Sequence, residues 1–154
     1  MHDTRNLDAT FSALLALVGC LNSPRQDDVL LHEAGVALDR ALFPLLVRLS
    51  STGAMSVAQL ADRAGRDPST VSRQVAKLEQ LGLVRRPHAH SDMRVREAAI
   101  TKAGERVVAA ITGARHKLLG KLLEDWSVHE RQIFPQLLQR LADSMNQALG
   151  AAER

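Results

Sequence analysis

The stretch SVAQLADRAGRDPSTVSRQVAKLEQLG, residues 56–82, decides the fold of this chain. Its first signal is Ser56 followed three residues later by Gln59, a pair that typically forms a capping box at the start of a helix. This helix is expected to run to about Ala64, because Gly65 and Arg66 then make a tight turn. One short helix therefore lies at the beginning of the stretch.

A second helix is predicted directly after that turn. Asp67 is a good N-cap, and Pro68 suits the first helical position, where a missing amide hydrogen costs nothing. The helix should run over residues 68–81 and end at Gly82. Two short helices joined by a turn that contains glycine form a helix-turn-helix.

The residues after Gly82 change from helical to strand periodicity. Leu83–Arg86 and Arg94–Ile100 are predicted as two strands, and the polar loop Pro87–Met93 joins them. A hairpin that follows a helix-turn-helix in this way is a wing. The segment 56–101 is therefore predicted to be a winged helix-turn-helix.

The helix over 68–81 has two chemically different faces. Rotation by about 100° per residue places one set of apolar residues inward: Val71, Val75, Leu78 and Leu81. The outward set carries hydroxyls, an amide and two cations: Ser69, Thr70, Arg73, Lys77 and Gln80. These side chains suit base edges and phosphates, and the readers of bases should lie near the helix N-terminus, at Ser69, Thr70 and Arg73. Ser72 and Gln74 are candidate phosphate contacts. The alternative is an ordinary amphipathic helix with a solvated face.

The predicted wing is rich in arginine. Arg94 and Arg96 lie on one strand, and Arg85 and Arg86 lie on the other. An arginine at a hairpin tip can enter a minor groove, where the negative potential is enhanced. Asp92 could hold the Arg94 guanidinium in place, or the two could form a surface ion pair of little consequence, and spacing alone does not choose between them.

Helices are predicted on both sides of the winged segment. The helix over Asp8–Leu21 is apolar or small on all sides, which in a short chain favours burial against a second subunit. A further helix is expected from Asp27 to about Ser51, with Pro44 as a kink or a boundary within it. After the wing, one helix should run from Thr101 to about Asp125, and another from Ser127 to about Leu149. The predicted fold class is mainly α with a small β-wing.

Composition supports a globular protein but adds little about its partner. The chain has 154 residues and a formal net charge of +3, and residues 56–101 alone carry +3. A local basic excess favours a polyanion. No apolar run reaches the roughly 20 residues that span a bilayer, and no signal-peptide pattern opens the chain. The single cysteine, Cys20, excludes an intramolecular disulfide and is typical of a reducing compartment, so a cytoplasmic location is expected.

About 50 consecutive residues resemble the MarR family of bacterial transcription regulators. The resemblance is carried by SVAQLA (56–61), DPSTVSR (67–73), LEQLGLVRR (78–86), DMR (92–94) and ITKAG (100–104), in that order. It departs at the wing sequence PHAH (87–90). It implies one domain over 1–154, in which helices of 1–51 and 102–154 form an obligate homodimer and 56–101 binds a pseudo-palindromic operator. It also implies that Asp92 braces Arg94.

The resemblance raises three hypotheses about how the protein senses a signal. A small aromatic or anionic effector could bind near His32, Met55, Arg86 and His116, although these side chains could equally be solvated or packed. Cys20 is interpreted as a packing residue, because it lies in the last turn of its helix, where the dipole disfavours a thiolate. His88 and His90 lack further ligands for a structural zinc site, so no metal or other cofactor is predicted, and a regulatory metal site across a dimer stays open.

The sequence therefore predicts a homodimeric DNA-binding transcription regulator, in the first place a repressor. A winged-helix module that binds only proteins is the main alternative, but the outward face over 69–80 carries no apolar anchors for a protein partner. An enzyme is disfavoured because no nucleophile–base pair, phosphate loop or metal triad is present.

Overall fold

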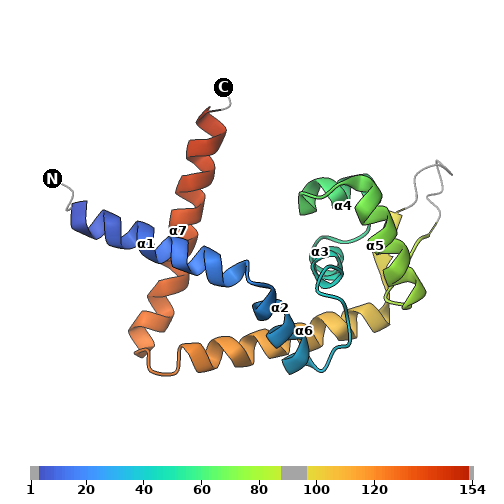
Figure 1. Ribbon diagram of the computed structural model, residues 1–154, viewed down its shortest axis with the longest axis horizontal. Coiled ribbons are helices and arrows are strands. Elements are labelled where there is room, and N and C mark those ends of the chain that lie inside the picture. The colour runs from blue at the N-terminus through green and yellow to red at the C-terminus, as the bar shows by residue number, and fades with distance from the viewer. Residues whose placement is uncertain (1–3, 88–96, 153–154) are drawn as a thin grey trace. The chain divides into compact units, whose positions relative to one another are not determined.

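The computed structural model describes residues 4–87 and 97–152 of the chain. It divides into two compact units, Met1–Arg115 and His116–Arg154. The first unit begins with three helices, α1 (Thr4–Leu21), α2 (Pro24–Ala34) and α3 (Phe43–Thr52). The winged segment follows, as the elements β1 (Met55–Ser56), α4 (Val57–Ala64), α5 (Pro68–Gln80), β2 (Val84–Arg85) and β3 (Glu97–Ile100). Helix α6 (Lys102–Leu122) crosses the boundary between the units, and α7 (Val128–Ala152) belongs to the second (Figure 1). The mainly helical fold with a small β-wing is thus confirmed.

Helices α4 and α5 begin as the sequence predicts. The Gln59 backbone amide donates to the Ser56 hydroxyl at 3.2 Å, and the Gln59 side chain accepts from the Ser56 amide at 3.0 Å, so the capping box is complete. Gly65 ends α4 with φ of 62°, a left-handed conformation that only glycine adopts without strain. Asp67 then caps α5, accepting the Thr70 backbone amide at 3.1 Å. The helix-turn-helix therefore forms from local chemistry.

The three strands form one antiparallel sheet in the order β1-β3-β2. Val84 pairs with Ile100 and Arg85 with Ala99, which confirms that the two stems of the predicted hairpin pair. The loop and the first part of the second predicted strand, 88–96, lie outside the described residues. Met55 pairs with Ala98 through β1, a two-residue strand that the sequence analysis does not predict. The strand after the wing is therefore the middle one.

Thr101 joins the end of α5, the first wing strand and the start of α6. Its hydroxyl donates to the Gly82 carbonyl at 2.7 Å and accepts from the Gly104 amide at 3.1 Å. Its backbone amide donates to the Leu83 carbonyl at 3.0 Å. A Cβ at Gly104 would collide with the Leu83 carbonyl oxygen, so this close approach of two backbones requires glycine. Thr101 is the N-cap of α6, as predicted.

One hydrophobic core holds the winged segment together. It unites α3, α4, α5 and the sheet, and its fully buried members include Leu45, Leu46, Leu49, Leu60, Val71, Val75, Leu78 and Ala98. The predicted inward face of α5 is confirmed for three of its four residues. Leu81 is the exception, at 46% exposed, because α5 ends at Gln80 and Leu81 sits at its C-cap. The core orients α5 with its polar face outward.

The helix predicted over 27–51 is two helices. Gly35 ends α2 with φ of 65°, and α3 starts only at Phe43, with Pro44 in its first turn. Between them the chain turns at Asp39, whose carboxylate Oδ1 accepts the Ala41 amide at 2.7 Å. Pro44 therefore marks a helix start, which is the boundary alternative rather than the kink.

The second unit contains the last part of α6 and all of α7. Ser127 and Glu130 form the predicted second capping box, with N···O distances of 2.8 and 3.2 Å. The rings of Trp126 and Phe134 meet edge to face at 4.9 Å between centroids. Helix α7 continues through Gly150, the predicted stop, to Ala152. Pro135 lies inside α7, near its start.

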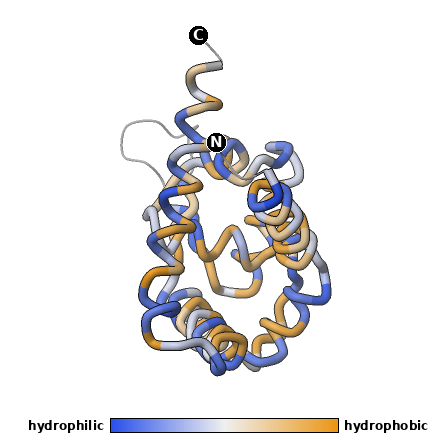
Figure 2. The backbone as a smooth tube through the Cα atoms, turned by 90° about the vertical axis from the view of Figure 1, so that its left-hand side faces the viewer, coloured by the Kyte–Doolittle hydropathy of each residue, from blue (hydrophilic) through white to orange (hydrophobic). Residues whose placement is uncertain are grey.

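Helices α1 and α7 bury almost nothing within the chain, although apolar residues recur along the helical backbone (Figure 2). No residue of Thr4–Leu21 is buried, and none of 128–151 is. Large apolar side chains are exposed on both helices, among them Leu7, Phe11, Leu15, Val18, Leu21, Val128, Ile133, Leu137, Met145 and Leu149. In the described part of the chain, no single helix meets the length and hydropathy of a membrane span; α1 and α2 meet them only as a pair bent by 56°.

Candidate nucleic-acid interface

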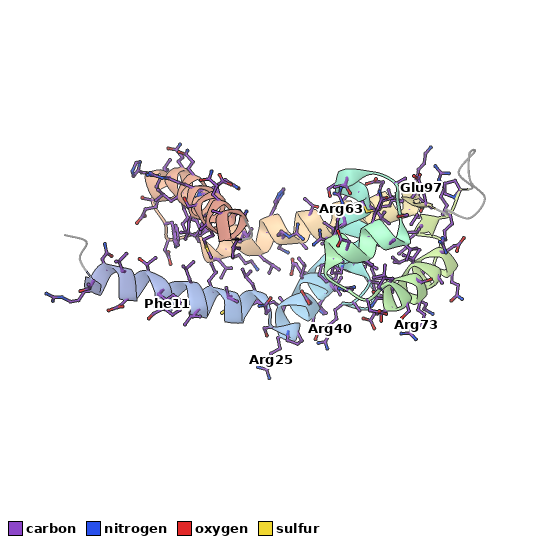
Figure 3. The ribbon with its side chains drawn as sticks, turned by 90° about the horizontal axis from the view of Figure 1, so that it is seen from above. Phe11, Arg25, Arg40, Arg63, Arg73 and Glu97 are labelled. Carbon is purple, nitrogen blue, oxygen red and sulfur yellow. The ribbon has the colours of Figure 1, made fainter. Side chains whose placement is uncertain are left out.

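The outward face of α5 is polar and cationic, as predicted. Ser69, Ser72, Arg73, Lys77 and Gln80 are exposed, and Thr70 and Gln74 are half-buried. The opposite face is buried in the core, so this polar face has a fixed orientation on a rigid element. Arg73 lies at one edge of the first unit together with Arg40, whereas Arg63 of α4 lies away from that edge (Figure 3). Helix α5 therefore offers its donors and cations to a partner outside the chain.

The N-terminal turn of α5 holds its polar side chains in fixed positions. The Ser69 hydroxyl donates to the Asp67 carboxylate, and Arg73 Nη2 lies 3.5 Å from the Thr70 hydroxyl oxygen. The hydrogen bond from the Ser69 hydroxyl has the largest effect in lowering the pKa of Asp67, and the bond from the Thr70 backbone amide has the next largest. Because the Ser69 proton is used within the chain, its oxygen is left to accept a hydrogen bond from outside.

Gln74 has a partner that the sequence analysis does not predict. Arg66, in the turn before α5, donates from Nη1 to Gln74 Oε1 at 3.0 Å and to the Ala41 carbonyl at 2.7 Å. Arg66 is half-buried, so these bonds are shielded from solvent. No local pattern could have revealed them, since the two partners lie eight and 25 positions away in the sequence. Arg66 thus connects the chain between α2 and α3 to α5.

A groove of about 350 Å³ runs along α5 beside that connection. Thr70, Arg73, Gln74 and Lys77 line it from the helix, and Asp39, Ala41 and Leu42 line it from the other side. It lies on the polar face of α5. Two of its lining residues, Arg73 and Lys77, are cations that the sequence predicts to contact DNA.

The structure places only part of the predicted wing site. Arg85 is exposed on β2, and Arg86 follows it, half-buried. Asp92, Arg94 and Arg96 lie outside the described residues, so the bracing of Arg94 by Asp92 stays a prediction.

Comparison with known proteins decides the family. The model of the MarR family matches residues 38–96. The chain is also 38% identical over 104 residues to the uncharacterized HTH-type transcriptional regulator YxaD of Bacillus subtilis, covering 68% of this chain and 73% of that protein. The chain belongs to the MarR family. This MarR-family protein is a DNA-binding transcription regulator and not an enzyme.

The chain is also similar to other regulators and to solved structures. The transcriptional regulator HosA of Escherichia coli is 32% identical over 76 residues, which are 49% of this chain and 56% of HosA. A MarR family protein from Bacillus stearothermophilus superposes with a TM-score of 0.80 at 23% identity, covering 95% of this chain and 99% of that one. RV1404 from Mycobacterium tuberculosis superposes with a TM-score of 0.72 at 26% identity, covering 91% and 94%.

The structure does not gather the predicted effector residues of this MarR-family chain in one described cavity. Met55 is buried in the core at β1, His32 is exposed on α2, and Arg86 is half-buried after β2. His116 is exposed on α6 and belongs to the second unit. The effector site stays a prediction, and Met55 already has a packing role.

Among the described residues, neither Cys20 nor the histidines belong to a group of side chains that could bind a metal ion. Cys20 is exposed in the last turn of α1. Within residues 4–87 and 97–152, no group of three or more His, Cys, Asp or Glu side chains is placed to hold a metal ion. His88 and His90 lie outside these ranges.

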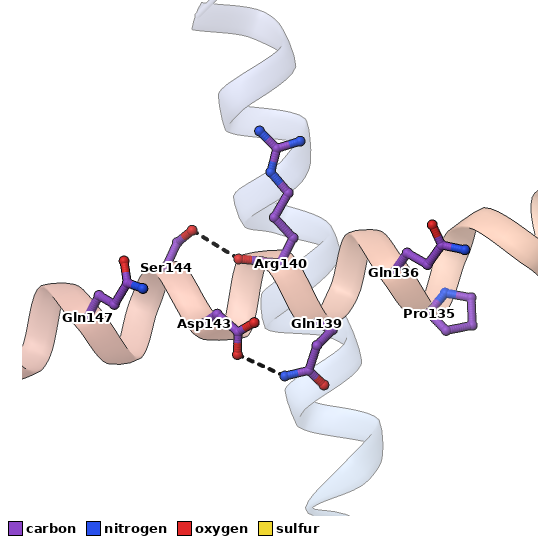
Figure 4. Close-up of a pocket in the computed structure, with 7 residues that line it drawn as sticks. All are labelled: Pro135, Gln136, Gln139, Arg140, Asp143, Ser144 and Gln147. Carbon is purple, nitrogen blue, oxygen red and sulfur yellow. Dashed lines mark hydrogen bonds between the residues drawn. The ribbon is translucent and has the colours of Figure 1, made fainter.

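The second unit carries a groove of about 600 Å³ on the polar side of α7 (Figure 4). Its lining includes Gln139, whose amide donates to the Asp143 carboxylate at 2.9 Å, and Ser144, whose hydroxyl donates to the Arg140 carbonyl at 2.9 Å. Both bonds lie within α7, so this groove is a surface of one helix.

Proposed function

We propose that this MarR-family regulator is a homodimeric repressor that binds a pseudo-palindromic operator with α5 in the major groove. The observation that carries the proposal is the two-sided character of α5. Val71, Val75 and Leu78 are fully buried, while Arg73 and Lys77 project from the opposite face. A helix fixed in this way presents its outward donors to base edges as one rigid surface.

Each predicted contact has a distinct role in this proposal. Ser69, Thr70 and Arg73, in the first turns of α5, read bases, and Ser72 and Lys77 neutralise or bind phosphates. Arg85, Arg94 and Arg96 hold the DNA backbone or minor groove beside the wing, with Asp92 bracing Arg94. Phosphate contacts by these cations make binding fall steeply as salt rises.

Dimerisation is supported by the apolar side chains that α1 and α7 leave uncovered. Phe11 is 63% exposed and Leu149 is 65% exposed within one chain. Large contiguous apolar surfaces mark interaction sites, and a second copy supplies an equivalent surface. We therefore assign the helices of residues 1–51 and 102–154 to dimerisation and 56–101 to DNA binding, with α3 also packed in the core of the winged segment. Two copies of α5 related by a two-fold axis require an operator with the same symmetry.

Repression and its relief complete the proposal. A dimer on its operator excludes other proteins from the same DNA, and we place it in the cytoplasm with the genome. A small aromatic or anionic effector releases the DNA if it binds better to a dimer conformation that does not fit the operator. His32, Arg86 and His116 supply the polar and cationic groups that such an effector would meet.

The test starts from duplex DNA that the wild-type protein selects from a random library. Arg73→Ala should lose discrimination between the selected sequence and single-base variants, by about 1–3 kcal/mol at the affected position. Arg94→Ala should lose affinity for all of these sequences alike. Arg63→Ala, an exposed arginine away from the Arg73 edge, is the matched control. If the Arg73 and Arg94 variants bound the selected duplex as tightly and as selectively as wild type, the site assignment would be wrong.

A further inference from the structure

We propose that the turn over residues 39–42, between α2 and α3, contacts DNA in addition to α5 and the wing, with Arg40 as its phosphate ligand and Arg66 as the residue that positions it. The inference rests on the proposed function, since it extends the surface around α5. It adds a contact that lies outside both the helix-turn-helix and the wing.

The turn is ordered by its own hydrogen bonds and by the core. Asp39 accepts the Ala41 amide on its carboxylate at 2.7 Å and the Leu42 amide on its carbonyl at 2.9 Å. Leu42 is 6% exposed and belongs to the core, and its carbonyl accepts the Leu45 amide at 3.2 Å. The turn is therefore held on one side by its buried leucine, which leaves Arg40 exposed on the other.

Arg66 fixes the distance between this turn and α5. One guanidinium nitrogen donates both to the Ala41 carbonyl, at 2.7 Å, and to Gln74 Oε1, at 3.0 Å. A half-buried arginine bridging a loop carbonyl and a helix side chain acts as a cross-link between the two elements. Leu42, which packs in the same core as Val71 and Val75, provides a second connection between the turn and α5.

The same contact determines what Gln74 can offer. Arginine has donors only, so the amide of Gln74 must turn its oxygen toward Arg66, and its NH₂ group faces elsewhere. A glutamine that reads adenine uses its oxygen and its nitrogen together. Gln74 instead offers its NH₂ donors, which suit a phosphate oxygen or an acceptor on a base edge.

Charge and position identify the occupant of the groove between the turn and α5 as a sugar–phosphate strand. Arg73 and Lys77 line one wall, and Asp39, Ala41 and Leu42 of the turn line the other. Arg40 is exposed on that turn next to these lining residues, and it lies toward the same edge of the first unit as Arg73 in the view of Figure 3. A helix about 10–12 Å wide fills a major groove of about 12 Å, so elements beside it meet the flanking phosphates. Among the described residues that line the groove, Asp39 is the one with a carboxylate, and its Oδ1 accepts the Ala41 amide.

The experiment measures how binding depends on salt, using the duplex that wild type selects. Arg40→Ala should make the plot of log K against log salt shallower by about 0.9 for each subunit bound, because one phosphate contact is lost. The loss of affinity should be the same for single-base variants of the duplex. Arg63→Ala should leave the slope at its wild-type value. A wild-type slope in Arg40→Ala would overturn the inference, whereas failure of wild type to select any duplex would overturn the proposed function instead.

The positioning role of Arg66 needs a second comparison. Arg66→Met removes both hydrogen bonds, so Arg40→Ala should change the slope less in the Arg66→Met background than in wild type, and Arg66→Lys should restore part of the difference. Thermal unfolding of each variant reports stability separately. If Arg66→Met lowered stability but Arg40→Ala kept its full effect on the slope, Arg66 would be structural only and the positioning role would be wrong.

Discussion

The winged lobe, made of α3, α4, α5 and the sheet, and the terminal helices α1 and α7 use the same types of apolar residue in opposite ways. In the lobe, Leu45, Leu60 and Val75 are fully buried, so one chain completes that core by itself. In α1 and α7, Phe11 and Leu149 are more than 60% exposed within one chain. The difference teaches that hydrophobic periodicity alone indicates a helix with a buried face but does not say which molecule covers that face. A single chain therefore completes the core around α5 and leaves the apolar faces of α1 and α7 exposed.

The largest expected effect comes from changing the exposed apolar face of α1, which we propose to be part of the dimer interface. Phe11→Asp with Leu15→Asp places charges on the exposed face of α1, twice per dimer. Each lost apolar contact is worth about 1.5–3 kcal/mol, so the dimer dissociation constant should rise more than about a thousandfold. Sedimentation velocity at micromolar protein should then show a monomer. Leu81→Asp, at an exposed leucine of the lobe, is the control and should stay dimeric. A double variant that remained a dimer would show that α1 is covered by something other than a second copy.

An intermediate effect compares two glycines of one helix. Gly104→Ala forces a methyl group against the Leu83 carbonyl and should destabilise the lobe by about 1–3 kcal/mol. Gly113→Ala meets no atom within 4 Å and should stabilise α6 by up to about 1 kcal/mol. Chemical unfolding of both variants measures the difference. Equal effects would mean that the close approach between α6 and the wing strand does not constrain the fold.

The smallest expected effect concerns the cap of α5. The pKa of Asp67 is lower in the folded chain than its ordinary value of 3.8, so its stabilising effect is fully present above that value. The effect is lost as the pH falls below 3.8 through the folded pKa. The melting temperature of wild type should therefore fall more between pH 6 and pH 3 than that of Asp67→Asn. The asparagine keeps a cap without the charge. Parallel losses in the two proteins would contradict this role of the carboxylate.

The sequence predicts those parts of the fold that depend on neighbouring residues. Ser56 with Gln59, Asp67 with Pro68, and Ser127 with Glu130 are local signals, and the structure confirms the helix start at each. The break between α2 and α3 is not predicted, because Gly35 lies within a stretch of helically spaced leucines. The left-handed backbone of Gly35 ends α2 there in spite of that spacing. Strand β1 was missed because two residues carry no periodicity.

The residues of the candidate site also divide into those that local sequence predicts and those that depend on the tertiary fold. The outward face of α5 follows from helical geometry, so Arg73 and Lys77 could be predicted from the sequence. Arg66 could not, because its role depends on a carbonyl and an amide brought to it by the tertiary fold. The exposure of Leu81 also escaped prediction, since it depends on the helix ending one residue earlier than its apolar spacing indicates.

The order of strands in the small sheet has a consequence for how the chain is made. Strand β3 lies between β1 and β2, yet it is synthesised after both of them. A chain that ended at residue 87 would contain the helix-turn-helix and both outer strands but not the strand that joins them. During synthesis, which proceeds at about 5–20 residues per second, the lobe must therefore wait with two unpaired edges until Ile100 has emerged. A fragment made to isolate the DNA-binding lobe has to extend through β3 and on to Gly104, beyond the wing itself.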